Sequence, residues 1–165
     1  MRTQLLLSAL AIAAAAAPAS AQFPADAVGF HWTGAAGNTA GPFCWGFQCA
    51  PDATTVSPGE SATLLVRGDP YAVFVVALSA TATSCLSIPG IAHSLVLDAP
   101  LYVAFTGTLD RLSPILSCPS GEKTIPISFP TSAIPGTTLA IQAIVLPVSG
   151  FAPPSLTQAI VLTVV

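Results

Sequence analysis

Charged side chains are scarce in this sequence. Its 165 residues include only four Lys and Arg and seven Asp and Glu, which gives a net charge of −3. Nucleic-acid binding relies on many basic side chains that displace counterions, so these few bases argue against a nucleic-acid partner. Phosphate binding and acid–base catalysis also need ionisable groups, and the composition therefore favours a non-enzymatic function.

Metal ligands and activated nucleophiles are equally scarce. His31 and His93 are the only imidazoles, and no Gly-x-Ser-x-Gly nucleophile elbow is present. Copper and zinc sites need clustered His and Cys ligands, which these spacings do not supply. Calcium binding through loop carboxylates is the alternative that the sequence leaves open. Asp98 and Asp110 flank one apolar run and are the best pair for glycoside hydrolysis, but we interpret them as solvated strand ends. The sequence predicts no catalytic residue, no metal and no cofactor.

Long apolar runs are absent after the first 21 residues, because Pro, Gly, Ser and Thr interrupt every stretch. Residues 1–21 have a basic start at Arg2, an apolar stretch and an Ala-Ser-Ala sequence ending at Ala21. This pattern is typical of a secretory signal peptide cleaved before Gln22. The apolar stretch is shorter than the ~20 residues a membrane span needs, and a retained anchor is the alternative. We expect a secreted or cell-surface protein with no membrane span after leader removal, and the periplasm is a second location.

The expected export of the protein indicates the role of its four cysteines. In an oxidising compartment, Cys44, Cys49, Cys85 and Cys118 are expected to form disulfides rather than to hold a metal. Four cysteines allow three pairings. Because Cys44 and Cys49 are close in CWGFQC, where Gly46 can bend the chain, we favour a local Cys44–Cys49 bridge and a second bridge between Cys85 and Cys118.

The spacing of turn residues indicates the fold class. Sixteen Pro and twelve Gly separate short runs rich in Val, Ile, Leu, Phe and Thr, which is typical of an all-β sandwich or barrel. No long window after the leader repeats apolar residues with a helical period. We predict a two-sheet antiparallel sandwich, immunoglobulin-like, with about eight strands. Residues 22–52 would form an aromatic and Gly-rich N-terminal segment with the local disulfide, and residues 53–165 the sandwich domain.

Individual strands follow from alternation of apolar and polar residues. In residues 61–67, Ala62, Leu64 and Val66 would face the core while Arg67 faces water. Residues 71–78 are apolar on both faces and indicate a central strand, and Pro126 places its own strand at a sheet edge or at a bulge. The remaining predicted strands are a pair formed by 94–98 and 102–109, and the segments 124–129, 138–146 and 156–165.

From Cys44 onward, the order of short motifs resembles secreted β-sandwich modules that occur in many copies in planctomycete-type bacteria. The motifs are an early cysteine, SPGESATLLVRG at 57–68, IPGIAHSLVLD at 88–98, and a closing region with Gln-Ala at 142–143 and 158–159. The usual glycine beside the first cysteine is replaced by Phe43-Cys44-Trp45. The resemblance implies an exported immunoglobulin-like or fibronectin-like sandwich of unknown function.

One region is rich in aromatic residues and glycines. Between residues 28 and 51, both tryptophans of the chain and three phenylalanines occur close together, namely Phe30, Trp32, Phe43, Trp45 and Phe47. Exposed on a rigid loop, such rings would form a stacking platform for sugars or an anchor for a protein partner, because large rings lose little entropy on binding. Alternatively, they cover an open end of the sandwich.

These observations give three functional hypotheses. The first is a non-enzymatic structural or adhesive module of a bacterial cell surface or extracellular matrix, with self-association or other surface proteins as partners, because exposed sheet edges with little charge can pair. The second is a carbohydrate-binding module that uses the Trp-containing loop, with glycans as partners. A small hydrolase is the third.

Overall fold

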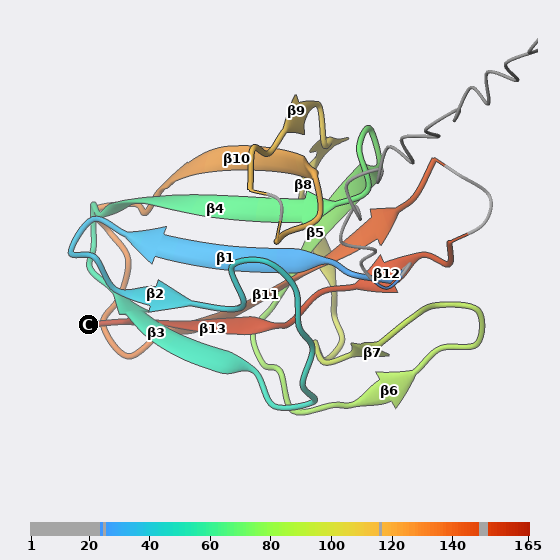
Figure 1. The fold of residues 1–165 in the computed structure, drawn as a ribbon. Coiled ribbons are helices and arrows are strands. Elements are labelled where there is room, and N and C mark those ends of the chain that lie inside the picture. Colours follow the sequence, from blue (N-terminus) through green and yellow to red (C-terminus); the bar gives the residue numbers. More distant parts are fainter. Residues whose placement is uncertain (1–23, 25, 116, 149–151) are drawn as a thin grey trace, which may run out of the picture.

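The computed structural model describes residues 24, 26–115, 117–148 and 152–165, and the predicted signal peptide lies outside this part of the chain. The described residues contain no helix, and so none that could cross a membrane. Their strands, coloured along the chain in Figure 1, are β1 Gly29–Gly34, β2 Thr39–Ala40, β3 Asp52–Val56, β4 Ser61–Gly68, β5 Val73–Ser79, β6 Leu86–Ser87, β7 Ser94–Leu95, β8 Tyr102–Thr108, β9 Arg111–Leu112, β10 Gly121–Ser128, β11 Thr138–Leu146, β12 Ser155–Leu156 and β13 Ile160–Val164.

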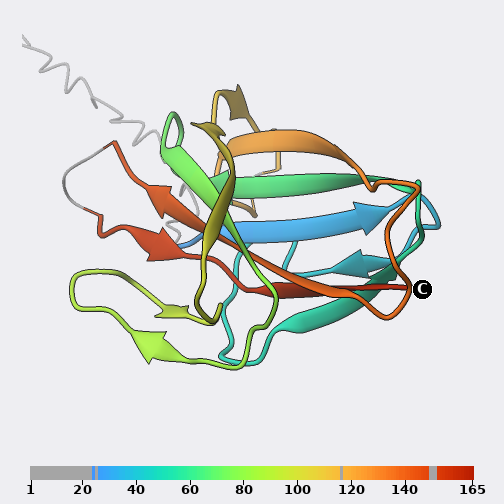
Figure 2. The ribbon, with the colours of Figure 1, turned by 180° about the vertical axis from the view of Figure 1, so that it is seen from behind.

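Two sheets pack face to face, which confirms the predicted all-β sandwich. The first sheet has the order β2-β1-β4-β10-β9, and the second has the order β3-β13-β11-β5-β8, with β12 also paired to β11. Figure 1 shows the first sheet in front, and Figure 2 shows the second sheet from behind. Five strands of the described chain have only two residues, so eight longer strands remain, in agreement with the predicted number.

The strand order is immunoglobulin-like. In that fold, one sheet contains strands A, B and E, and the other contains G, F and C, to which variable-type domains add C′. Here β1-β4-β10 and β13-β11-β5-β8 follow these orders. One pair departs from the predicted antiparallel arrangement, because β3 runs parallel to β13. The chain reaches β3 after crossing from the first sheet, so the first strand of the fold is divided between both sheets.

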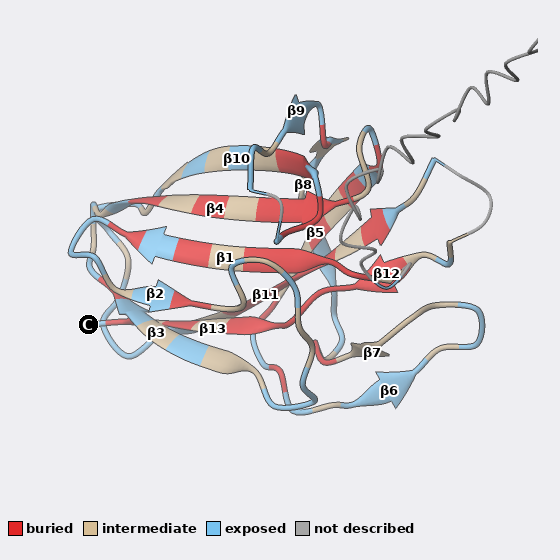
Figure 3. Cartoon of the chain, viewed as in Figure 1, coloured by how far each residue is buried: buried red, intermediate tan, exposed pale blue. Residues whose placement is uncertain are grey.

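The main core lies between the sheets, as the buried positions in Figure 3 show. The alternation predicted for residues 61–67 is confirmed on its inner face, because Ala62, Leu64 and Val66 are buried in this core. The opposite sheet contributes alternate residues of β5, β11 and β13, and both Phe30 and Trp32 of β1 enter the same cluster. β1 and β2, which fall within the predicted N-terminal segment, extend the first sheet of the sandwich.

A smaller layer covers the outer face of the second sheet. β6 and β7 form a hairpin, and a second apolar cluster beneath it contains Val96, Leu97, Ala140 and Ala159. The predicted pairing of 94–98 with 102–109 is therefore wrong: β7 pairs with β6, whereas β8 pairs with β5. The physical reason is that Val96 and Leu97 are buried in this cluster, which holds their segment away from β8.

The positions of the central and edge strands agree with the sequence. β5, predicted to be central, lies between β11 and β8. β10 pairs with β4 along its whole length but with β9 only at Gly121 and Glu122. Pro126, whose ring nitrogen cannot donate a hydrogen bond, therefore lies at a sheet edge as predicted.

Candidate functional site

The chain crosses from the first sheet to the second between β2 and β3. Residues 43–49 of this crossing contain three aromatic residues and two cysteines, and we call them the aromatic loop. Cys44 is bonded to Cys118, between β9 and β10, and Cys49 is bonded to Cys85, between β5 and β6. The predicted Cys44–Cys49 and Cys85–Cys118 bridges are therefore wrong. Because the loop crosses between sheets, its two ends meet different parts of the chain.

Glycines allow the aromatic loop to lie close to β1. A Cβ atom at Gly29 would be 2.3 Å from the carbonyl oxygen of Cys44, a distance that no side chain tolerates. Gly46, beside Trp45, has a φ of 153°, which residues with a Cβ rarely adopt. These glycines therefore allow the loop to take this path, and the disulfides hold it there.

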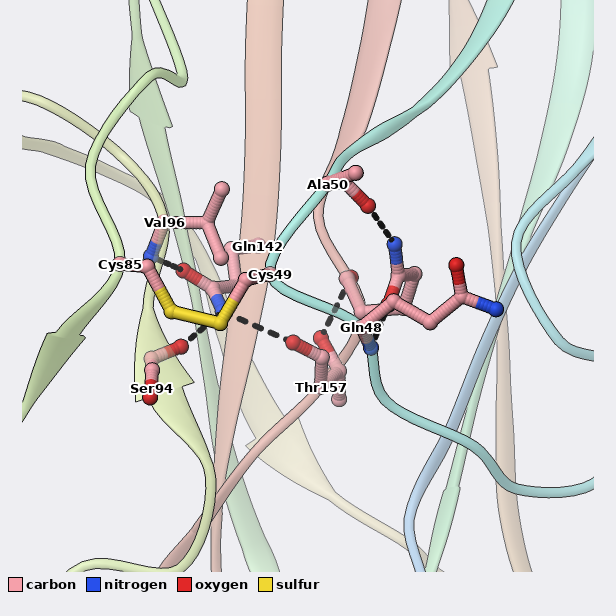
Figure 4. Close-up of a disulfide and its surroundings, with 9 residues drawn as sticks. Gln48, Cys49, Ala50, Cys85, Ser94, Val96, Gln142 and Thr157 are labelled. Atoms are coloured by element: carbon pink, nitrogen blue, oxygen red, sulfur yellow. Dashed lines mark hydrogen bonds between the residues drawn. A yellow bond between two sulfur atoms is a disulfide. The ribbon is translucent and has the colours of Figure 1, made fainter.

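Two glutamines, Gln142 on β11 and Gln158 between β12 and β13, hold this region together, and Figure 4 labels Gln142 with its partners. The buried carboxamide of Gln158 accepts a hydrogen bond from the Gln48 N–H and donates one to the Ala50 carbonyl, which anchors the end of the aromatic loop. Gln142 accepts from Val96 N–H at 3.0 Å and donates to the carbonyls of Ser94 and Thr157. Both amides bind backbone groups that would otherwise be unpaired, so we assign them structural roles.

The other end of the loop covers a buried ion pair. Arg67 Nη2 lies 2.8 Å from Glu122 Oε2, Nη1 donates to Ser113 Oγ at 3.0 Å, and the guanidinium lies 4.5 Å from the centre of the Phe43 ring. Burial lowers the pKa of Arg67, and Glu122 partly offsets that shift. The prediction that Arg67 faces water is wrong: its side chain leaves the outer face of the sheet but is only 3% exposed, since Phe43 and Ser113 cover it.

The five aromatic residues singled out in the sequence do not form one platform. Phe30 and Trp32 are 0% exposed and belong to the core. Trp45 is 50% exposed and Phe43 is 44% exposed, while Phe47 is half-buried. Phe43 already contacts Arg67, and its ring also packs edge-to-face against His31. Trp45 is therefore the main ring of this group that remains open to a ligand.

Two hollows are both lined by the segment formed by Trp45, Gly46 and Phe47. The first, of about 350 Å³, is also lined by Asp26, His93, Pro24, Ala27 and Val28. The second, of about 310 Å³, is also lined by Gln48, Asp52, Gln158, Gly41 and Pro42. Each hollow thus combines the indole of Trp45 with a carboxylate and a second polar side chain.

His93 is held in the first hollow in an unusual conformation. Its ring stacks on Phe47, with centroids 4.9 Å apart and planes inclined by 15°. Its Nε2 lies 3.2 Å from the Asp26 carbonyl oxygen and 3.8 Å from Oδ2 of the same residue. The backbone φ of His93 is 65°, a region that residues other than glycine rarely occupy and that is enriched at functional sites. His93 directly precedes β7, and it lines the hollow.

The carboxylates considered for hydrolysis are each committed elsewhere. Hydrogen bonds from Ser84, Thr81 and Thr83 hold the pKa of Asp98 well below its usual range. A hydrogen bond from Lys123 Nζ, 2.7 Å from Oδ2, lowers the pKa of Asp110. A glycosidase acid needs a raised pKa, so this pair lacks a proton donor. The described ranges also contain no cluster of three or more His, Cys, Asp or Glu that could bind a metal ion.

Sequence reasoning missed Asp26, Gln48 and Asp52 as neighbours of Trp45. No local pattern marks Asp26 or Asp52, since the fold brings them to Trp45 only as the chain crosses between the sheets, whereas Gln48 lies in the aromatic loop itself. Burial of Trp32 did leave a signal, because Phe30 and Trp32 alternate with His31 and Thr33 as in a half-buried strand. The polar glutamines within the apolar segments at 142 and 158 were a second signal, of buried hydrogen bonding.

Comparison with known proteins adds little. No protein-family model matches the chain, and no curated protein matches it, so the resemblance to planctomycete-type modules stays a prediction. Among solved structures, an AA10 lytic polysaccharide monooxygenase (LPMO) from Streptomyces lividans matches 67% of this chain, with 16% sequence identity and a TM-score of 0.37. The match spans 58% of that protein's chain.

This match corrects the first functional hypothesis. The sequence predicts a structural or adhesive module, whereas the matched protein is named for a polysaccharide, which agrees better with the alternative of carbohydrate binding. At this TM-score, the likeness carries no argument about the activity of the present chain. The case for a glycan ligand must therefore rest on the residues around Trp45.

Proposed function

We propose that this protein is an exported, non-catalytic carbohydrate-binding module whose main contact is the indole ring of Trp45. The observation that carries the proposal is the 50% exposure of Trp45 on a loop bonded at both ends to distant parts of the chain, Cys44 to Cys118 and Cys49 to Cys85. An exposed indole offers a flat apolar face to the C–H groups of a sugar ring, and its N–H can bond a hydroxyl.

The surroundings of Trp45 supply hydrogen bonds of the kind that sugar hydroxyls need. Asp26 and His93 line one neighbouring hollow, and Gln48 and Asp52 line the other. Carboxylates accept hydrogen bonds, whereas the amide and imidazole can both donate and accept. Because Trp45 lines both hollows, a chain of several sugars could contact Trp45 and place hydroxyls in both.

The rigidity of the loop supports the same function. A binding loop that is ordered before the ligand arrives loses less conformational entropy on association. The two disulfides and the amide of Gln158 restrict the loop. Disulfides are typical of oxidising compartments, which supports export to a place where extracellular glycans occur.

Binding of the labelled protein to a glycan array and to insoluble cellulose, chitin and xylan tests the proposal. We expect Trp45→Ala to weaken binding of the recognised glycan about tenfold or more, as for other aromatic hot spots. Tyr102→Ala is the matched control, because Tyr102 is 63% exposed but lies on β8, outside both hollows. The proposal fails if no glycan is bound, or if the two variants bind equally well.

A further inference from the structure

A second candidate site lies between the sheets, away from the aromatic loop. The sandwich ends in β8 on one sheet and in β10, followed by the short β9, on the other. Beneath these edges is a cavity of about 210 Å³ with an almost entirely apolar lining. Its walls include Trp32, Leu78, Phe105, Ile127, Phe129 and Leu139.

Several inward-facing side chains around this cavity are incompletely covered. Leu78, Phe105, Ile127, Phe129 and Leu139 pack against the main core but are only partly buried. Apolar side chains on the inner faces of a sandwich are ordinarily covered by the opposite sheet. Here their exposure follows from the gap between the two edge strands, so a ligand that enters there would remove apolar surface from water.

Trp32 contributes a buried hydrogen-bond donor to the lining of this apolar site. Its side chain is fully buried and lines the cavity, and its ring packs edge-to-face on Phe129 at 5.8 Å. Within the described ranges, its Nε1–H has no hydrogen-bond acceptor. An unpaired buried donor is costly, and a ligand acceptor that reaches Nε1 by displacing the partly buried side chains around it would remove that cost.

The free edge of β10 is poorly suited to an added strand. The Ser113 N–H donates to the Ser120 carbonyl on the β9 side, so even-numbered residues of β10 direct their backbone groups away from β4. Pro126 is one of them and has no N–H, which interrupts the donors of this edge. A small molecule therefore fits the opening better than a peptide strand does.

We propose that this cavity binds a small apolar molecule with one hydrogen-bond acceptor, such as a ketone, and that Trp32 Nε1–H donates to that acceptor. The volume suits a ligand of about ten non-hydrogen atoms, since a cavity of roughly 150 Å³ in another protein holds benzene. This site is independent of glycan binding, because it shares no residue with the two hollows beside Trp45.

Acetophenone and cumene form a matched pair of probes, because they have similar shapes but only acetophenone has a carbonyl. Indole N–H signals of the 15N-labelled protein report binding, and Trp45→Phe assigns the remaining signal to Trp32. We expect acetophenone to shift the Trp32 signal downfield and to bind about fivefold more tightly than cumene, as one net hydrogen bond implies.

Two variants separate ligand binding from general effects on the fold. Ile127→Phe should fill the cavity and abolish the response, whereas Thr124→Phe, on the outer face of the same strand, should retain it. An unchanged Trp32 signal in the folded wild type, equal affinity for both probes, or equal loss in both variants would overturn the proposal. The proposal would also be overturned if the protein formed a dimer that Ile127→Phe dissociates and that does not bind acetophenone, because a second copy of the chain would then cover the opening.

Discussion

The disulfide pairing can be tested by removing cysteines in two combinations. The double variant Cys49→Ser with Cys85→Ser removes one bridge of the structure and leaves Cys44 and Cys118 joined. The double variant Cys44→Ser with Cys49→Ser breaks both bridges of the structure. If Cys44 and Cys49 were bonded locally instead, the second variant would remove only one small loop, and the first would break both bridges.

Loop-closure entropy gives the expected magnitudes. The two bridges join residues separated by 74 and 36 positions, so they stabilise the fold by about 4.5 and about 3.8 kcal/mol respectively, whereas a local bridge would contribute only about 2.2 kcal/mol. We therefore expect the Cys49/Cys85 variant to lose about 4 kcal/mol of unfolding free energy. The Cys44/Cys49 variant should lose considerably more, and a domain of this size need not survive that loss as a folded protein.

Urea denaturation and thiol titration together make the measurement. The Cys49/Cys85 variant should have no free thiol, and the Cys44/Cys49 variant should have two when titrated in denaturant. Peptide mapping of the unreduced wild type would give an independent result. The reasoning is refuted if the Cys44/Cys49 variant is the more stable of the two, or if the Cys49/Cys85 variant contains reactive thiols.

Two further predictions concern charged groups. Glu122→Gln should lower the unfolding free energy by about 3 kcal/mol in urea denaturation, because it leaves the buried Arg67 guanidinium without its counter-ion. The control Asp110→Asn, in an exposed pair with Lys123, should change the unfolding free energy little. Equal losses of stability in the two variants would contradict this account. Because the pKa of Asp98 is lowered in the folded state, its carboxylate stabilises the fold above its unfolded pKa of about 3.9, and this contribution is lost as the pH falls below that value. Thermal unfolding of Asp98→Asn should therefore depend less on pH in the acid range than that of the wild type, and parallel pH profiles would show that the hydrogen bonds from Ser84 and Thr83 are unimportant.

The sandwich could be predicted because its determinants are local. Alternation in residues 61–67 and a run that is apolar on both faces at 71–78 reflect which faces of one segment meet water. The proline in β10 reflects which backbone edge lacks a donor. The same reasoning was wrong for Arg67, because alternation gives the direction of a side chain but cannot show that another segment covers it. Phe43 covers Arg67 from a loop that lies more than twenty residues away in the sequence.

The candidate site depends on such distant contacts and could be predicted only in part. The sequence identified the aromatic segment, but it could not distinguish the buried Trp32 from the exposed Trp45. That difference arises because β1 directs Trp32 into the core, whereas the crossing between sheets carries Trp45 around the outside of the sandwich. The cysteine pairing has the same origin: the two ends of the crossing meet different parts of the chain, so closeness in sequence favoured the wrong partner.

The two tryptophans consequently offer opposite chemistry to a ligand. Trp45 presents a ring to solvent beside carboxylates, which suits hydroxyl-rich molecules, whereas Trp32 contributes one buried N–H to an apolar cavity. Because the two sites share no lining residue, a ligand for one need not affect the other through direct contact. Coupling would require the core strand β1 or the crossing that follows it to move, and Gly29, with Cys44 packed against it, resists that movement. We therefore expect glycan affinity to be the same with and without acetophenone, and a change in affinity would show that the crossing loop shifts when the cavity is occupied.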